Sequence, residues 1–304
     1  MRWVAFSFGL LGAFLLGMAG MFALNPQDKL AGSAAMKAGI AGTYALLGLL
    51  FGVFAVGLGL LKRWARNLAI QLLWPWLACG LLAAPALPFL LPSFFSATFA
   101  ANGLSAQVLE ITVWVMTALD ILMGVAWPAL MLLALNGERE KAACLAAQPE
   151  PDWTEGCPPR AFSLSLAFGL YAVSCFPGMM MANFYVPLFG SAIYGLQGAF
   201  ALIGLAILAG RACYGAYRQE GWVWWLGIAG TPLWSISYQL TLGQLGWAGI
   251  MRVMHPEMDE ALVTKSAEMM QNFPALTAAL ALNGLLLFYF WYVRRDFIGE
   301  TKPG

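Results

Sequence analysis

The spacing of the charged residues constrains this chain more than any other feature. Seven stretches of the 304 residues contain no Asp, Glu, Lys or Arg. They cover residues 3–27, 38–61, 67–109, 121–137, 161–210, 221–251 and 269–293. About 20 apolar residues span a bilayer as a helix, and a soluble core rarely needs such runs. Because only 10% of the residues are charged, the chain is predicted to be a multi-pass membrane protein.

Turn signals divide these stretches into about eight helices. The stretches 67–109 and 161–210 are too long for one crossing, so each is expected to turn once. The first break is marked by Pro92, Ser93, Asn102, Gly103 and Ser105, and the second by Asn183, Pro187 and Gly190. The predicted fold is an all-α, polytopic transmembrane helix bundle. Its helices are expected at about residues 3–24, 38–61, 68–90, 108–135, 161–182, 191–210, 222–247 and 273–293.

The basic residues give this arrangement a direction. Lys and Arg concentrate in cytoplasmic loops, and eight crossings with both termini inside put twelve of the sixteen basic residues on the inner side. The inner set is Arg2, Lys62, Arg63, Arg66, Arg139, Lys141, Arg160, Arg211, Arg218, Arg294, Arg295 and Lys302, and the outer set is Lys29, Lys37, Arg252 and Lys265. A miscounted helix would scramble this bias, so the split favours eight crossings and cytoplasmic termini.

Short echoes at one offset of 160 residues indicate an internal repeat. Phe8-Gly9-Leu10 recurs as Phe168-Gly169-Leu170, and Thr117-Ala118 recurs as Thr277-Ala278. Four helices per half is an even number, so the two halves would share one orientation in the membrane. The sequence therefore predicts a 4+4 parallel repeat about an axis along the membrane normal, unlike the inverted repeats of many transporters.

The only sizeable polar segment separates the two predicted halves. Residues 137–160 carry alternating charge and several prolines, which is typical of a surface connector. The expected organisation is a first four-helix half at 1–136, a cytoplasmic connector at 137–160 and a second four-helix half at 161–304.

Composition excludes several chemistries. A single histidine, His255, cannot supply a bis-histidine haem site or a multi-histidine metal centre. The five cysteines show no CxxC spacing, and a net charge of +1 without a basic tail disfavours nucleic acid as a partner. No cofactor and no metal is expected, and no paired acids or Ser/His set suggests an enzyme.

Asp120 is the leading candidate for a functional residue. It lies near the middle of the helix expected at 108–135, where an ionised carboxylate costs at least about 2.5–3.5 kcal/mol. No Lys or Arg lies at matching depth in another expected helix, so the carboxyl group should be protonated, hydrogen-bonded across helices or facing a wet cavity. Asp120 is thus either a proton or substrate site or a structural tie. Glu110, about 15 Å along the helix, is too distant for an aspartyl dyad.

Asn283 is the second polar group expected near the membrane midplane. Under the 160-residue offset it corresponds to position 123, one turn from Asp120 on the same helix face. Two such positions near a pseudo-twofold axis would suit a central site. A hydrogen bond between helices explains Asn283 equally well.

The helix expected at 222–247 carries the most polar stretch inside any crossing. Tyr238, Gln239 and Gln244 are its candidate binding residues. Gln or Ser facing lipid is unfavourable, so this side of the helix should face protein or water. A further segment, 256–273, has an apolar and an acidic face, which predicts an amphipathic helix on the outer surface.

The run Pro149-Glu150-Pro151-Asp152-Trp153-Thr154-Glu155-Gly156-Cys157-Pro158 and the elbow Leu61-Lys62-Arg63-Trp64-Ala65-Arg66 support one resemblance. Together they resemble segments of uncharacterised multi-pass bacterial inner-membrane proteins, which carry a Pro-x-Pro-x-Trp-Thr-acidic-x-Cys-Pro loop. The resemblance implies the architecture and a bacterial inner membrane, and it implies no activity.

Two classes of function fit these observations. The first is a permease-like or channel-like transporter, favoured by the duplicated bundle and by Asp120 and Asn283. The second is a non-catalytic membrane subunit or assembly factor, favoured by the lack of any catalytic motif. The expected partners are the lipid bilayer and either a small-molecule substrate or another membrane subunit.

Overall fold

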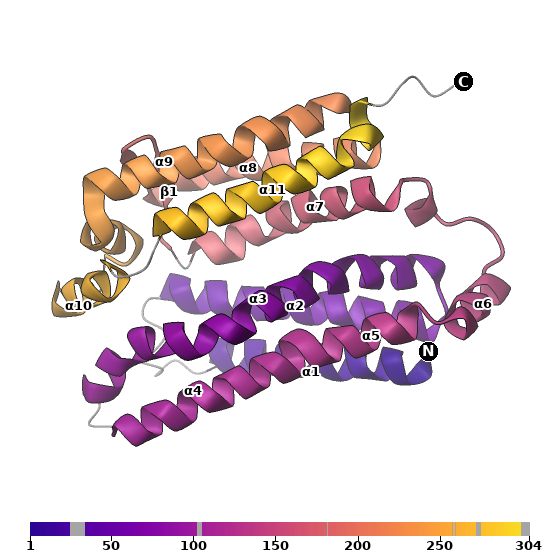
Figure 1. Ribbon diagram of the computed structural model, residues 1–304, viewed down its shortest axis with the longest axis horizontal. Coiled ribbons are helices and arrows are strands. Elements are labelled where there is room, and N and C mark those ends of the chain that lie inside the picture. The colour runs from indigo at the N-terminus through magenta and orange to yellow at the C-terminus, as the bar shows by residue number, and fades with distance from the viewer. Residues whose placement is uncertain are drawn as a thin grey trace. The chain divides into compact units, whose positions relative to one another are not determined.

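A computed structural model describes residues 1–24, 34–101, 105–180, 182–256, 258, 260–271 and 275–298. Most of these residues are helical (Figure 1). Five helices are long and apolar enough to cross a membrane: Arg2–Leu24, Lys37–Gly59, Arg63–Phe89, Ala106–Leu135 and Gly195–Tyr217. The predicted helical, multi-pass membrane architecture is therefore confirmed.

The chain forms two compact units. The first unit comprises Met1–Ala13 and Leu49–Thr154, and the second comprises Phe14–Gly48 and Glu155–Gly304. The boundary passes through two long helices, α1 (Arg2–Leu24) and α2 (Ala34–Gly59). The remaining elements of the first unit are α3 (Arg63–Ala101), α4 (Ala106–Asp120), the π-helical segment η2 (Ile121–Ala126), α5 (Trp127–Leu135), α6 (Glu138–Ala147) and the 3₁₀ turn η3 (Trp153–Glu155), whose last residue belongs to the second unit.

An aromatic cluster joins the helices of the first unit. The ring of Phe8 on α1 lies 5.7 Å from that of Phe51 on α2 and 5.2 Å from that of Trp127 on α5. Trp76 on α3 lies 5.3 Å from Trp127, whose indole N–H donates to Ser7 Oγ at 2.7 Å. Aromatic pairs at these separations stabilise packing by about 0.5–1.5 kcal/mol each. The cluster therefore links all four long helical segments of this unit.

The second unit contains α7 (Pro159–Met180), β1 (Val186–Leu188), β2 (Ser191–Ile193), α8 (Gly195–Tyr217), α9 (Gly221–Met254), α10 (Glu260–Gln271) and α11 (Ala275–Ile298). Helices α7, α8, α9 and α11 lie side by side (Figure 1), with α7 packing on α8, α8 on α9, α9 on α11 and α11 on α7. These four helices close into a ring. The Trp224 indole N–H ties α9 to α11 by donating to the Phe290 carbonyl oxygen at 2.8 Å.

The elbow between α2 and α3 is a tight left-handed turn. Leu61 has a φ of 56°, and the Lys62 N–H donates to the Gly57 carbonyl oxygen at 2.8 Å, which is the bond pattern of a Schellman cap. A Cβ atom on Gly57 would lie 2.9 Å from the Trp64 ring. Glycine at position 57 thus lets Trp64 fold back over the end of α2.

The elbow between α8 and α9 has the same construction. Gln219, 158 residues after Leu61, has a φ of 60°, and the Glu220 N–H donates to the Gly215 carbonyl oxygen at 2.8 Å. A Cβ atom on Gly215 would lie 2.9 Å from the Trp222 ring. A glycine and a tryptophan therefore pack against each other at both elbows.

The predicted loop after residue 90 is wrong where the structure describes it. α3 continues as one helix to Ala101 and contains Pro75, Pro85, Pro88 and Pro92. Proline removes a backbone hydrogen bond, but its φ is compatible with a helix, and in membrane proteins neighbouring groups can satisfy the freed carbonyls. Asn102 and Gly103 lie outside the described residues.

The turn expected at 183–190 is a short β-hairpin, so the all-α prediction needs this correction. β1 and β2 pair antiparallel, with Val186 opposite Ile193 and Leu188 opposite Ser191. Left-handed backbone recurs around it, at Asn183, Phe184 and Phe189 with φ between 41° and 54°. Such conformations persist only where surrounding contacts hold them.

The amphipathic segment expected at 256–273 contains α10, which packs on α9. Its buried side chains are Val263 and Ala267, while Thr264 and Glu268 are exposed. Arg252 near the end of α9 forms an ion pair with Glu260 at the start of α10. Glu257, Asp259 and Phe273, which the prediction also used, lie outside the described residues.

Candidate functional site

Asp120 lies where the helical hydrogen-bond pattern changes. It is the last residue of α4, and the π-helical segment η2 follows it directly. The Trp127 N–H donates to the Leu122 carbonyl oxygen, five residues back. Pro128 has no N–H to donate to Gly124, and the wider turn before it accommodates this loss. Single π-turns of this kind occur frequently at functional sites.

Two glycines bring α3 and η2 into backbone contact beside Asp120. A Cβ atom on Gly80 would collide with the Gly124 carbonyl group, and one on Gly124 would lie 3.2 Å from the Gly80 Cα. The Gly124 Cβ would also lie 2.7 Å from Oδ1 of Asp120. Small residues are typical where membrane helices approach closely. Here the Asp120 carboxyl group lies next to Gly124, where η2 contacts α3.

The Asp120 carboxyl group is incompletely satisfied. Its Oδ2 is buried and has no hydrogen-bond partner among the described residues. A buried carboxyl oxygen without a partner is costly in an apolar medium. A proton, a cation, a polar ligand or a water molecule would each remove that cost. Glu110 is exposed on α4, and nothing places it with Asp120.

The polar face of α9 binds the β-hairpin. Ser237 Oγ accepts from the Phe189 N–H at 2.9 Å and donates to the Pro187 carbonyl oxygen at 2.9 Å. Thr241 Oγ1 accepts from the Gly190 N–H at 3.1 Å. Both hydroxyl side chains are buried, with Thr241 0% exposed. The hydroxyl groups of these two residues therefore satisfy backbone groups at the tip of the hairpin.

The three candidate residues of α9 have different surroundings. Gln244 is exposed, and its side chain occupies the space next to Gly190, where a Cβ would lie 2.6 Å from Nε2. Tyr238 and Gln239 are half-buried, and Gln239 has an interaction partner. The structure thus brings Gln244 to the hairpin.

Tyr185 is a polar residue of this region that sequence reasoning missed. It lies in the turn before β1, and its hydroxyl group is buried without a hydrogen-bond partner among the described residues. Burial, with a smaller contribution from Tyr238, raises the pKa of Tyr185 to about 12. No periodicity marks a tyrosine in a turn, so only the packing of the hairpin could have revealed it.

Asn283 forms a tie between two helices of the second unit. Its Nδ2 donates to Ser235 Oγ on α9 at 2.5 Å and to the Ala279 carbonyl oxygen at 2.6 Å. Its Oδ1 is buried without a partner in the described part of the chain. Asp120 belongs to the first unit and Asn283 to the second, so a central site containing both stays a prediction.

The two segments that carry the family resemblance contact each other. Arg63 of the elbow donates from Nη1 to the Gln148, Pro149 and Glu150 carbonyl oxygens at 3.3, 3.2 and 2.9 Å. Asn67 donates to Thr154 Oγ1 at 2.9 Å. These hydrogen bonds therefore attach the loop to the start of α3, which gives its polar groups a structural role.

The connector contains a helix that was not predicted, α6, with Cys144 buried in it. Burial raises the pKa of the Cys144 thiol, and the nearby Arg66 opposes this only in part. A neutral, buried thiol is a poor nucleophile. Among the described residues, no group of three or more His, Cys, Asp or Glu side chains could hold a metal ion.

Comparison of the chain with protein-family models, with curated proteins and with solved structures finds no match.

Proposed function

We propose that the chain is a permease-like or channel-like membrane protein with eight crossings, in which Asp120 serves a translocated solute or proton. α7, α9 and α11 supply the three crossings beyond the five apolar spans, with 22, 34 and 24 residues. About 20 residues suffice. Their polar groups favour this reading, because Ser165, Ser237 and Asn283 all make hydrogen bonds inside the bundle.

The two elbows support a parallel repeat within this proposal. Their left-handed residues, Leu61 and Gln219, stand 158 residues apart, and their glycine–tryptophan pairs share that offset. The first helix pair of each half gives a related correspondence. A Cβ on Gly9 would lie 3.5 Å from Ala55, and one on Gly169 would lie 3.2 Å from Cys213. Two halves of like construction are a common plan in membrane transporters.

The proposed location is the bacterial inner membrane with both termini in the cytoplasm. The support is the twelve-to-four distribution of Lys and Arg and the resemblance of the connector loop. Both elbows and the connector would then lie on the cytoplasmic side. The hairpin and α10 would lie on the outer side.

The observation that carries the transport proposal is the buried Asp120 Oδ2 without a hydrogen-bond partner beside the Gly80–Gly124 crossing. A buried carboxyl oxygen without a partner is costly in an apolar medium, and a proton, a cation or a polar ligand would remove that cost. An ionisable residue inside a membrane bundle is by default a candidate for a proton relay or a substrate site. The π-turn at the same place supports this reading.

Cysteine accessibility tests the proposal without knowledge of the substrate. In a chain lacking its native cysteines, Asp120→Cys should react with a small, charged, water-soluble thiosulfonate, because a translocation path must contain water. Leu119→Cys is the matched control at the same depth, since Leu119 is 48% exposed on the outside of the helix and would face lipid. Labelling is read by mass spectrometry of the intact chain.

Equal, negligible labelling of both positions would show that water does not reach position 120, and this result would contradict the transport proposal. The second candidate, a non-catalytic membrane subunit, would then be favoured. One observation already supports it: the hydroxyl groups of Ser237 and Thr241, on the most polar helix, accept hydrogen bonds from the hairpin backbone. Native mass spectrometry after gentle purification would detect a stoichiometric partner chain.

A further inference from the structure

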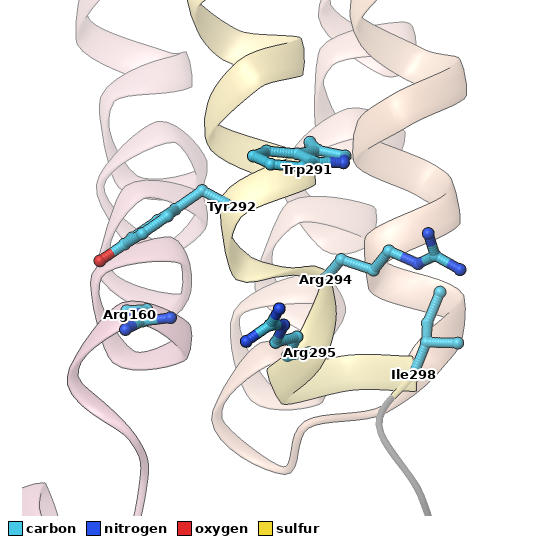
Figure 2. Close-up of a pocket in the computed structure, with 6 residues that line it drawn as sticks. All are labelled: Arg160, Trp291, Tyr292, Arg294, Arg295 and Ile298. Atoms are coloured by element: carbon cyan, nitrogen blue, oxygen red, sulfur yellow. The ribbon is translucent and has the colours of Figure 1, made fainter.

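A cationic cavity lies at one end of the second unit. It has a volume of about 570 Å³ and is lined by Arg160, Trp291, Tyr292, Arg294, Arg295 and Ile298. Arg160 comes from the first turn of α7, whereas the other five residues come from the end of α11 (Figure 2). Cavities of this size hold small ligands. Two helices thus contribute three arginines to the lining of one cavity.

Contacts between the two helices hold this arrangement in place. The Arg160 guanidinium lies 4.3 Å from the centroid of the Tyr292 ring, within the range of a cation–π interaction. The Tyr289 hydroxyl donates to the Arg160 carbonyl oxygen at 2.9 Å. The start of α7 is therefore fixed to α11 through both backbone and side chain, and the cavity is preorganised.

Among the described residues, no carboxylate forms an ion pair with Arg160, Arg294 or Arg295. The ion pairs Met1–Glu140, Arg211–Glu220 and Arg252–Glu260 lie elsewhere and involve none of the three cavity arginines. Asp296 follows Arg295 in sequence, but it does not line the cavity and forms no ion pair with these arginines in the described chain. Clustered like charges without a counterion attract an anion.

The common explanation of basic residues at helix ends does not account for the cavity. Lys and Arg flank membrane helices on the cytoplasmic side, and cations are stabilised at helix C-termini such as that of α11. Arg160 is at an N-terminus, however, where the helix dipole disfavours a cation and favours an anion. Arg160 and Arg295 nevertheless line the same cavity (Figure 2), and this arrangement points to an anionic ligand.

We infer that this cavity binds a phosphate group. Guanidinium groups match phosphate oxygens in bidentate hydrogen bonds, and basic pockets between membrane helices bind lipid headgroups. Trp291 is 64% exposed at the rim, and its amphipathic ring suits the headgroup level of a bilayer. The phosphate could belong to an anionic phospholipid or to a soluble compound. The inference does not depend on Asp120, which lies in the other unit.

The test uses the full chain in detergent micelles and follows thermal unfolding by tryptophan fluorescence. One arm adds phosphatidic acid, a second adds inorganic phosphate, and a third adds sodium chloride at equal ionic strength. A specific ligand raises the unfolding temperature saturably. We expect Arg160→Gln with Arg295→Gln to weaken the apparent affinity at least tenfold, because two charged donors to the phosphate are lost.

The control pair is Arg139→Gln with Arg218→Gln, two exposed arginines whose loss changes the net charge equally. It should keep the wild-type affinity within about twofold. Should the first pair fail to fold, Arg294→Gln takes its place, because Arg294 is exposed and makes no ion pair in the described chain. Stabilisation by phosphatidic acid alone would assign the phosphate to a lipid, and stabilisation by inorganic phosphate as well would assign it to a soluble group.

Two results would overturn the inference. One is a wild-type chain that phosphatidic acid and inorganic phosphate stabilise no more than sodium chloride does. The other is an equal loss of affinity in the two arginine pairs, which would show a general charge effect.

Discussion

Asp120 and Asn283 show how two polar residues inside apolar helices can differ. Asn283 Nδ2 has two acceptors, Ser235 Oγ and the Ala279 carbonyl oxygen, and such interhelical bonds are worth about 0.6 kcal/mol on average. Asp120 Oδ2 has no partner among the described residues. Asn283 Oδ1 is likewise buried without a partner there, so at the scale of the residue the difference is that Asn283 makes two hydrogen bonds, whereas Asp120 carries an ionisable group.

Substituting Asp120 by Asn should separate folding from function. Asn has about the same size as Asp but cannot bind and release a proton or become negatively charged. We therefore expect the free energy of unfolding to stay within about 1 kcal/mol of the wild type, as for a conservative change. Proton flux into proteoliposomes, driven by a potassium diffusion potential and read by an enclosed pH dye, should be lost. Equal flux in both proteins would mean that Asp120 has no role in proton movement.

Gly80→Ala tests the close approach beside Asp120. The new Cβ would meet the Gly124 carbonyl group, and overpacking of this kind costs about 1–3 kcal/mol. Gly52→Ala is the matched control in α2, because a Cβ there meets nothing within 4 Å and alanine favours a helix by about 1 kcal/mol over glycine. The unfolding temperature should fall for Gly80→Ala and not for Gly52→Ala. A fall of equal size in both variants would contradict the close contact.

The Cys144 thiol should respond to pH in a defined direction. Burial raises its pKa above the ordinary value of 9.0, so the reactive thiolate is scarce at neutral pH and appears only as the pH rises past 9. With Cys144 as the single cysteine, reaction with a disulfide reagent should be slow at pH 7.5 and much faster at pH 9.5. Glu150→Cys, at an exposed position, serves as reference, and equal rates at pH 7.5 would contradict the burial of Cys144.

At the scale of the element, uncharged length predicted the long helices and little else. Uncharged apolar runs predicted most of α1, α2 and α8, although α2 begins before Lys37 and α8 continues past Arg211 to Tyr217. The sequence could not show that α3 passes through Pro92 to Ala101, because proline usually marks a break. In a membrane helix, neighbouring groups can satisfy the carbonyl groups that proline leaves free, so the helix can continue. The hairpin was missed because its partners, Ser237 and Thr241, lie about 50 residues away on α9.

The candidate site was predictable only in part, for the same reason. Charge inside an apolar run marked Asp120 from the sequence. Its π-turn and the Gly80 contact depend on the packing of α3 against η2, which no local pattern encodes. The arginine cavity also requires Arg160 and Arg295 to be brought together by α7 and α11, although sequence reasoning had treated both only as topology signals.

Thr241→Val should weaken the attachment of the hairpin to α9, which the two hydrogen bonds of Ser237 would still hold. Valine has the same shape as threonine but leaves the buried Gly190 N–H without its acceptor, which costs about 1–3 kcal/mol. Thr43→Val is the matched control, because the Thr43 hydroxyl donates back to the Gly39 carbonyl oxygen of its own helix. Amide hydrogen exchange at residues 186–193 should rise in the first variant alone, and unchanged protection there would contradict the clamp.

At the scale of the whole molecule, the 4+4 repeat is a proposal that two kinds of observation favour. The echoes Phe8-Gly9-Leu10 and Phe168-Gly169-Leu170 fall in α1 and α7. The stronger correspondence lies in backbone conformation, with left-handed Leu61 and Gln219 closing matching elbows. Apolar residues in a membrane helix can replace one another easily, whereas a turn of fixed geometry needs its glycine and its capping hydrogen bonds. Four helices in each half, with both ends on one side, remain the prediction.

Cysteine labelling of intact cells tests that central prediction most directly. In a chain without native cysteines, new cysteines at Leu188 and Glu268 should react with an impermeant maleimide from outside, and those at Glu150 and Arg218 should react only after the membrane is permeabilised. All four positions are exposed, so burial cannot mask the result. Labelling of Glu150 or Arg218 in intact cells, or protection of Leu188 or Glu268, would contradict eight crossings with both termini inside.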